Sequence, residues 1–262
     1  IITKYLRNKG YDVTTFARSN ADIIKNIEDT NAVTLFFNKI KNDYDFIINC
    51  IGLLVKDSNN NPAKAAIINS WFPHIIEESL RDSKTKLIHL STDCVFDGLK
   101  GNYVETDIHT ETNYYGKSKS FGEINNNKDI TFRMSIIGPE IKDSGTGLLH
   151  WIVNKSDKEV NGWSNALWNG ITTLQLAKCI EMYITNPVIT GVYHLVNNDN
   201  KINKYQLLCK INDIYKLKKH VRKSQSPKDV NKVLVDTRLE LNFGIPDYDT
   251  QLHELKKFTD NF

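Results

Sequence analysis

The feature that most constrains this sequence is the alternation of short apolar runs with amphipathic segments through its first half. Residues 45–51 contain apolar residues without polar alternates, as in a strand buried on both faces. Pro62 is predicted to open a helix that runs to about Ser83. The predicted strands are 12–17, 45–51, 86–91 and 129–135, and the predicted helices are 62–83 and 114–125. Strands that alternate with helices favour right-handed βαβ units, so we expect an α/β fold with a doubly wound parallel sheet.

The pattern becomes less regular after about residue 145. Helices are predicted over 146–155, 172–185 and 203–216, and a short strand over 191–196. We therefore expect a smaller lobe of mixed structure that is built on the sheet domain.

The start of the chain departs from what such a sheet normally shows. A nucleotide-binding sheet usually opens with a strand and a glycine-rich turn, which lets a pyrophosphate approach a helix N-terminus. Residues 1–9 already have the pattern of the helix that follows this turn, and Gly10 is predicted to cap that helix. We expect the first strand and the turn, roughly 15–20 residues, to be missing from this chain. The alternative is that the natural protein lacks them and does not bind a dinucleotide in the usual way.

Composition excludes several classes of protein. The 34 basic and 31 acidic residues give a net charge of only +3, which argues against a nucleic-acid-binding protein. The four cysteines form no C-x-x-C pair, so no metal site is predicted, and they are typical of reduced thiols in a cytoplasmic protein. No apolar run approaches the roughly 18–20 residues that would cross a membrane.

Tyr115 and Lys119 form a Tyr-x-x-x-Lys pattern within a predicted helix. Residues four apart lie on one face of a helix, so both polar tips can reach one site. A neighbouring ammonium favours the phenolate, and we expect it to lower the pKa of Tyr115 toward neutrality. Such a tyrosine can exchange a proton with a carbonyl oxygen, although the pattern alone is also common in exposed helices.

Context makes this pair more specific. Ser91, Thr92 and Asp93 stand at the end of a predicted strand, and the carboxyl ends of parallel strands are where such sheets bind ligands. A hydroxyl there can hydrogen-bond the same carbonyl oxygen. Taken alone, the three residues are equally typical of a turn or a helix cap.

Three stretches of this sequence resemble the extended short-chain dehydrogenases. They are Ser91 to Gly98 (Ser-Thr-Asp-Cys-Val-Phe-Asp-Gly), the spacing of Gly101, Tyr103, Glu105 and Asp107, and Tyr115 to Glu123. The closest resemblance is to the dTDP-4-dehydrorhamnose reductases and their sugar-nucleotide relatives. It implies a Rossmann-type domain over 1–145, to which 171–196 partly returns, and a lobe over 146–262 that mainly binds the sugar nucleotide. It also implies a catalytic triad of Thr92, Tyr115 and Lys119.

The same resemblance implies a nicotinamide cofactor. Arg18 follows the second expected strand, and an arginine there can pair with a 2′-phosphate, which favours NADPH over NADH. The alternative for Arg18 is a solvent-facing residue. Asn69 is expected in mid-helix, where an asparagine is otherwise usually solvated. Arg133 is interpreted as structural. The expected cofactor-binding residues are Arg18, Asn49, Cys50, Ile51, Gly52, Asn69, Ser91, Tyr115, Lys119 and Ser135.

The expected substrate-binding residues follow the triad threonine and recur in the second lobe. They are Thr92, Cys94, Val95, Phe96, Trp163, Asn165 and Trp168. Tryptophan faces pack well on sugar and base rings, and the alternative is that one or both tryptophans are core residues. Related dehydratases need an acidic pair after the threonine, and here the second place of that pair is Cys94. A thiol is a poor general acid for eliminating water, so the sequence argues against a simple dehydratase.

The resemblance therefore implies NAD(P)H-dependent reduction of the 4-keto group of a 4-keto-6-deoxy sugar nucleotide, for deoxysugar and glycan synthesis. The alternative is a non-catalytic, nucleotide-binding subunit similar to the regulatory beta subunit of methionine adenosyltransferase. The expected partner is a small-molecule sugar nucleotide, not a nucleic acid or a membrane. A homodimer is compatible with the sequence, which does not fix the oligomeric state.

Overall fold

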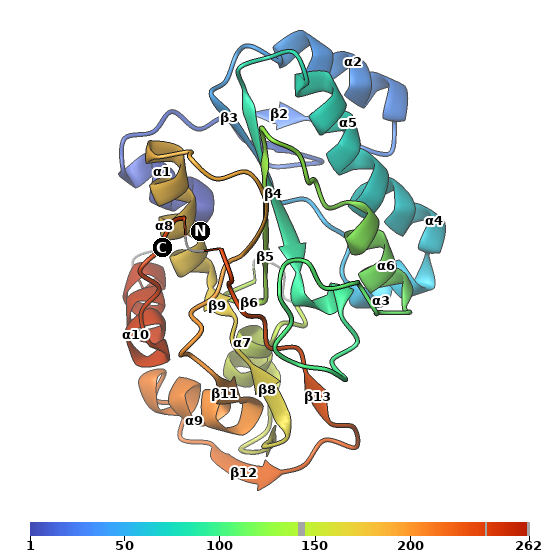
Figure 1. Cartoon of the computed structure of the whole chain (residues 1–262). Helices are drawn as coiled ribbons and strands as arrows, with labels where there is room; N and C mark the ends of the chain where they lie inside the picture. The colour runs from blue at the N-terminus through green and yellow to red at the C-terminus, as the bar shows by residue number, and fades with distance from the viewer. Residues whose placement is uncertain (141–144, 239, 261–262) are drawn as a thin grey trace.

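The computed structural model describes residues 1–140, 145–238 and 240–260. It confirms the predicted α/β fold, whose centre is a parallel sheet in the order β10-β5-β4-β3 (Figure 1). The strands are β3 (Phe46–Asn49), β4 (Lys86–Thr92), β5 (Ile130–Met134) and β10 (Gly191–His194). All but β10 come from the predicted strands of the first half, and β10 joins the sheet from residues beyond 145.

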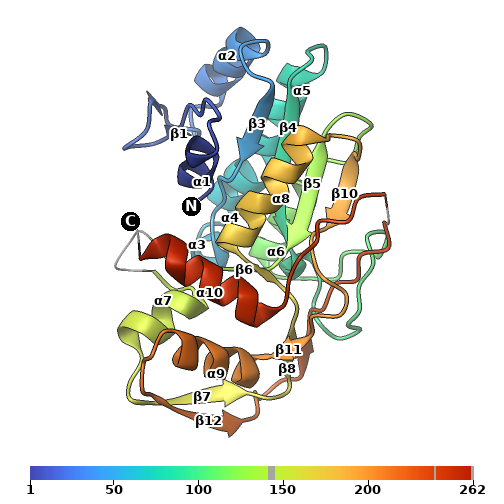
Figure 2. The same ribbon diagram turned by 90° about the vertical axis from the view of Figure 1, so that its left-hand side faces the viewer.

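Helices cover both faces of this sheet (Figures 1 and 2). One face is covered by α1 (Ile2–Asn8) and α8 (Thr173–Thr185), and the other by α2 (Thr30–Ile40), α5 (Phe72–Leu80) and α6 (Tyr114–Phe121). Each face has its own apolar core, with α1 and α8 in one cluster and α2 and α5 in another. The sheet is therefore buried on both sides, as its apolar strands require.

The N-terminal part differs from the prediction in one respect. Of the strand predicted over 12–17, only β1 (Phe16–Ala17) forms, and it pairs with β2 (Ile23–Ile24) instead of joining the central sheet. Within the described residues, β3 has no neighbour on the side away from β4. A parallel strand is held by hydrogen bonds to a neighbour, so residues 12–15 have no ladder to join.

The helix predicted over 62–83 ends earlier and is not uniform. It runs through α4 (Pro62–Ala65), the π-helical turn η1 (Ala66–Trp71) and α5, which ends at Leu80. The Asn61 side chain accepts a hydrogen bond from the Lys64 backbone N–H at 3.0 Å and so caps the start. A π-turn inside a helix is frequently found at a functional site, and this one contains Asn69.

The second lobe is built from short strand pairs and helices. Its strands are β7 (Glu159–Trp163) paired with β12 (His220–Ser224), β8 (Ala166–Trp168) between β11 (Ile202–Asn203) and β13 (Val230–Asn231), and β6 (Ile136–Ile137) paired with β9 (Ile171–Thr172). Its helices are α7 (Leu148–His150), η3 (Trp151–Lys155), α9 (Lys204–Ile214) and α10 (Tyr248–Thr259).

Helix α10, which was not predicted, packs against both α8 and α9 and so joins the two lobes (Figure 2). One apolar cluster extends from Phe132 on β5 to Leu208 on α9 and Leu252 on α10. The two lobes therefore share a hydrophobic core. No helix among the described residues has the length and apolar character needed to cross a membrane.

Candidate active site

The predicted triad comes together at the carboxyl end of β4. Thr92 is the last residue of that strand and caps the short 3₁₀ turn η2 (Asp93–Val95), accepting a hydrogen bond from the Cys94 backbone N–H at 3.1 Å. Its hydroxyl also donates to Asp93 Oδ1 at 3.1 Å. A backbone and a side-chain contact therefore fix the orientation of the Thr92 side chain.

Helix α6 brings Tyr115 to this strand end. The helix is capped by Asn113, whose side chain accepts from the Gly116 N–H at 2.9 Å. A Cβ at Gly116 would lie 2.4 Å from the Cys94 carbonyl oxygen, so only glycine permits this approach. At this spacing the Thr92 hydroxyl acts on the Tyr115 phenol and favours its ionised form.

The Tyr115 phenol does not have the lowered pKa that the sequence predicted. Burial raises its pKa above the ordinary value, the nearby Cys94 adds to the rise, and the Thr92 hydroxyl acts the other way. Lys119 is not among the groups that shift it. Tyr115 is therefore protonated at neutral pH, which is the state in which it can donate a proton.

The Lys119 ammonium is turned toward the sheet. Lys119 is only 5% exposed, and its Nζ donates to the Leu90 carbonyl oxygen on β4 at 2.7 Å. Burial lowers its pKa to about 8, although Glu123 and Cys50 partly offset this effect. The structure thus places Thr92, Tyr115 and Lys119 around one strand end.

Asn69 is not the solvated residue that a mid-helix asparagine usually is. It is fully buried in the π-turn, accepts from the Leu53 N–H at 2.7 Å, and donates to the Leu53 carbonyl at 3.1 Å and to Ser118 Oγ at 3.0 Å. It therefore ties the segment after β3 to helix α6, between Tyr115 and Lys119.

The other expected cofactor residues follow two further strand ends. Asn49 ends β3, where its side chain bonds the Ile51 N–H and the His89 ring, and Cys50 and Gly52 follow it. Ser135 follows β5 and accepts a hydrogen bond from Trp168 Nε1 at 2.8 Å. Arg18 stands exposed directly after β1, apart from the triad.

The expected substrate residues separate into different environments. Val95 and Phe96 are fully buried beneath the site, and the Phe96 ring stacks on Tyr103 at 4.1 Å. Trp168 is 3% exposed and stacks on Tyr248, whereas Trp163 on β7 is 47% exposed. Asn165 holds a turn through the Ser226 backbone. Substrate contacts by these residues stay predictions.

Two lysines of the second lobe were not predicted. The Lys204 Nζ, at the start of α9, lies 4.8 Å from the centre of the Trp168 ring, and Lys232 pairs with Glu111 at 3.1 Å. Both lysines interact electrostatically with Asp93 and Cys94, so both face the triad from the other lobe. They lie in no recognisable motif, and only the fold brings them here.

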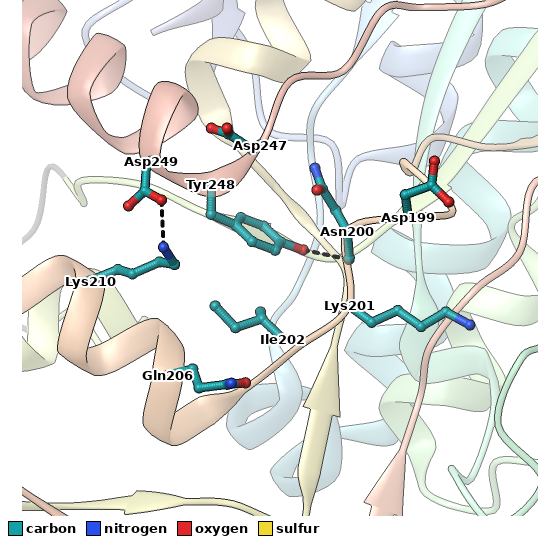
Figure 3. A pocket seen from close by; sticks show the side chains of 9 residues that line it. All are labelled: Asp199, Asn200, Lys201, Ile202, Gln206, Lys210, Asp247, Tyr248 and Asp249. Atoms are coloured by element: carbon teal, nitrogen blue, oxygen red, sulfur yellow. Dashed lines mark hydrogen bonds and ion pairs between the residues drawn. The ribbon is translucent and has the colours of Figure 1, made fainter.

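No group of His, Cys, Asp and Glu side chains in the described ranges is arranged to hold a metal ion. A separate hollow of about 280 Å³ lies between α9 and the start of α10 (Figure 3). Residues of the second lobe alone line it, including Lys210, Tyr248 and Asp249, and no predicted site residue is among them. A second hollow, about 650 Å³, lies between α1 and the segment 15–22 that carries Arg18.

The fold and the arrangement of Thr92, Tyr115 and Lys119 define a protein of the extended short-chain dehydrogenase type. The family model for the RmlD substrate binding domain matches residues 2–239. The chain therefore belongs to this family.

Comparison with a curated relative and two solved structures agrees with this placement. Methionine adenosyltransferase 2 subunit beta of Bos taurus is 27% identical over 208 residues, which is 73% of this chain but only 60% of that protein. A dTDP-4-dehydrorhamnose reductase from Clostridium acetobutylicum superposes with a TM-score of 0.81 and 21% identity, covering 99% of this chain and 94% of the other. The Bacillus anthracis dTDP-4-dehydrorhamnose reductase, in complex with NADP, has a TM-score of 0.79 and 20% identity, covering 100% and 94%.

Lys119→Met is expected to raise the free energy of unfolding at pH 7. The folded pKa of about 8 lies below the ordinary value of 10.5, so the buried charge opposes folding. At about 1.4 kcal/mol per pKa unit, the gain is at most about 3 kcal/mol. It should be full below pH 8 and fade as the pH rises toward 10.5. Urea unfolding at pH 7 and pH 9.5 measures it, with the exposed Lys117→Met as control. A gain that is equal at both pH values would contradict the buried charge.

Proposed function

We propose that this protein catalyses NAD(P)H-dependent reduction of the 4-keto group of a 4-keto-6-deoxy sugar nucleotide. The observation that carries the proposal is a protonated Tyr115 on which the Thr92 hydroxyl acts at the carboxyl end of β4, with the Lys119 ammonium bonded to the same strand. A cytoplasmic location and a homodimer stay predictions.

The residues of the site fit the chemistry of carbonyl reduction. The nicotinamide cofactor, when bound, supplies the hydride that reaches the carbonyl carbon. Tyr115 donates its phenolic proton to the carbonyl oxygen, and the Thr92 hydroxyl orients that oxygen by a second hydrogen bond. Lys119 would hold the ribose of the cofactor. The carbonyl thus gains one hydride and one proton and becomes an alcohol.

The fit to the cofactor is good at one end. Lys119 and the strand ends at Asn49 and Ser135 offer polar groups for the nicotinamide and its ribose, whereas Asn69 is fully buried and its amide bonds Leu53 and Ser118. At the other end, no described residues form the glycine-rich turn that would cradle the pyrophosphate. The hollow beside the segment of Arg18 is lined partly by Arg7 and Asp22, which form an ion pair at 3.1 Å, so the charge of Arg7 is already balanced there.

Cys94 supports reduction over dehydration. Burial raises the pKa of its thiol to about 12, and the Asp93 carboxylate adds to the rise. A thiol of this kind neither ionises at neutral pH nor replaces the acidic residue that a dehydratase needs at this position. Elimination of water from the sugar therefore lacks the second carboxyl group of the acidic pair.

A second candidate is a nucleotide-binding subunit without catalysis, similar to the bovine relative. That relative favours it, because 73% of this chain aligns with a protein that is named as the beta subunit of an enzyme. The assembled triad favours the enzyme, because a subunit that only binds has no need of a protonated Tyr115 held against Thr92.

Tyr115→Phe is expected to reduce turnover of a 4-keto sugar nucleotide by at least about 100-fold, because it removes the proton donor. NADPH oxidation followed at 340 nm measures this loss, and quenching of protein fluorescence shows whether the cofactor still binds. Tyr114→Phe is the matched control, since Tyr114 is the neighbouring residue and is 54% exposed. A fully active Tyr115→Phe variant would eliminate the proton-donor role. Cofactor and sugar-nucleotide binding without any turnover in the unaltered protein would favour the subunit.

Arg18→Ala is expected to weaken binding of NADPH about tenfold and of NADH hardly at all, because only NADPH carries the 2′-phosphate that a guanidinium pairs with. Dissociation constants of both cofactors decide this point. Arg81→Ala, which removes an exposed arginine on another element, controls for the general effect of charge. Equal weakening of both cofactors would show that Arg18 makes no contact with a 2′-phosphate.

A further inference from the structure

Glu123 lies just beyond helix α6, four residues after Lys119 and eight after Tyr115. Its carboxylate is only 6% exposed and accepts hydrogen bonds from two strands. Ser91 Oγ on β4 donates to it at 2.6 Å, and Arg133 on β5 donates through Nε at 2.8 Å and through Nη2 at 2.5 Å. One carboxylate therefore joins the end of α6 to the ends of β4 and β5.

Arg133 is itself held on all sides, as the sequence interpretation of a structural residue required. It is 1% exposed, and its Nη2 and Nη1 donate to His109 Nε2 at 2.8 Å and His194 Nε2 at 2.7 Å. His194 Nδ1 in turn bonds the Val235 carbonyl at 2.9 Å, and burial with the adjacent Arg133 lowers the pKa of His194 to about 4. The histidine is therefore neutral and its Nε2 is an acceptor. A fully bonded arginine cannot shift without breaking several contacts.

We propose that Glu123 is a positioning residue of the active site, which fixes the helix carrying Tyr115 and Lys119 against the strand ends that carry Thr92 and Ser135. The positioning role follows from the hydrogen bonds of Glu123, and its effect on catalysis rests on the proposed function. Ser135 is the second residue after Arg133, and Ser91 directly precedes Thr92. A displacement of the carboxylate therefore moves three elements of the site at once.

Glu123 has a second effect through charge. The groups that act on the Lys119 ammonium are Glu123 beyond α6, Cys50 after β3, and His89 on β4, which interacts with it. The burial of Lys119 lowers its pKa, and Glu123 is the larger of the two groups that oppose this shift. His89 is neutral at physiological pH because burial holds its pKa well below the usual range. Glu123 is thus the nearby carboxylate that favours the charged form of Lys119.

The ionisation of Lys119 determines how activity depends on pH. Activity that depends on the ammonium is present below the pKa of Lys119 and is lost as the pH rises through about 8. Removing the Glu123 charge lowers this pKa further, so the loss of activity must move to lower pH. A fall of roughly one unit would reduce kcat/KM at pH 8.5 by roughly eightfold, and hardly change it at pH 6.

Glu123→Gln tests the proposal, with Glu105→Gln as matched control. Glu105 is an equally buried carboxylate, 6% exposed, of the same network, but it bonds Thr237 and His194 and does not act on Lys119. The pKa of Lys119 is read directly from its ammonium signal by NMR of ¹⁵N-lysine-labelled protein, without turnover. The alkaline limb of the kcat/KM profile is the second readout.

The expected result is a lower pKa of Lys119 in Glu123→Gln and an unchanged one in Glu105→Gln, with the alkaline limb shifted in the first variant only. An unchanged pKa, or an equal fall in both variants, would overturn the proposal. If Glu123→Gln does not fold, the double variant E123Q/R133M removes both buried charges together. It is expected to lower the pKa of Lys119 by less, because the loss of the Arg133 charge acts in the other direction, and a rise in this pKa would overturn the proposal. Because the NMR titration needs no substrate, it can succeed even if the protein proves not to be a reductase.

Discussion

The close packing of helix α6 against the carboxyl end of β4 is the contact on which the rest of the site depends. It requires glycine at two positions. At Gly116 the Cys94 carbonyl leaves no room for a Cβ, and at Gly122 a Cβ would lie 1.8 Å from the Asn69 carbonyl oxygen. The helix is thus pressed against a strand end on one side and a π-turn on the other. A side chain at either position would separate Tyr115 from Thr92.

This contact also buries polar and charged groups, which lowers the free energy of unfolding. The Lys119 ammonium is buried and donates to one backbone carbonyl, that of Leu90. Tyr115 keeps its proton because burial raises its pKa. Arg133 and Glu123 are buried as a pair with further partners, an arrangement that is stable only when each polar atom is satisfied. The apolar clusters on the two faces of the sheet stabilise the domain, and the burial of polar groups at the strand ends offsets part of that stabilisation.

Much of this could be predicted from local patterns. The apolar runs gave the strands of the central sheet, and the residues from Ser91 to Lys119 predicted the triad, because both depend on short stretches of sequence. The segment 12–17 failed as a strand of the central sheet because a strand also needs a neighbour, which no local pattern reports. The pKa of Tyr115 was predicted in the wrong direction because burial, set by the whole fold, outweighs a charge on the next helical turn.

Local sequence patterns did not predict the contacts between residues that are far apart in the chain. Lys204 and Lys232 reach Asp93 only because the second lobe folds back over the strand ends. Trp168 had two interpretations, and its burial between Tyr248 and Ser135 comes from three separate elements. Glu123 and Arg133 are ten residues apart in the chain, yet nothing in their spacing reveals that Ser91, His109 and His194 complete their bonding.

Helix α10 has a consequence for how the two lobes unfold. It packs against α8 on the central sheet and against α9 in the second lobe, and one apolar cluster includes residues of all three helices. Neither lobe can expose its side of this cluster without exposing the side that belongs to the other. The two lobes are therefore expected to unfold together, as one cooperative unit.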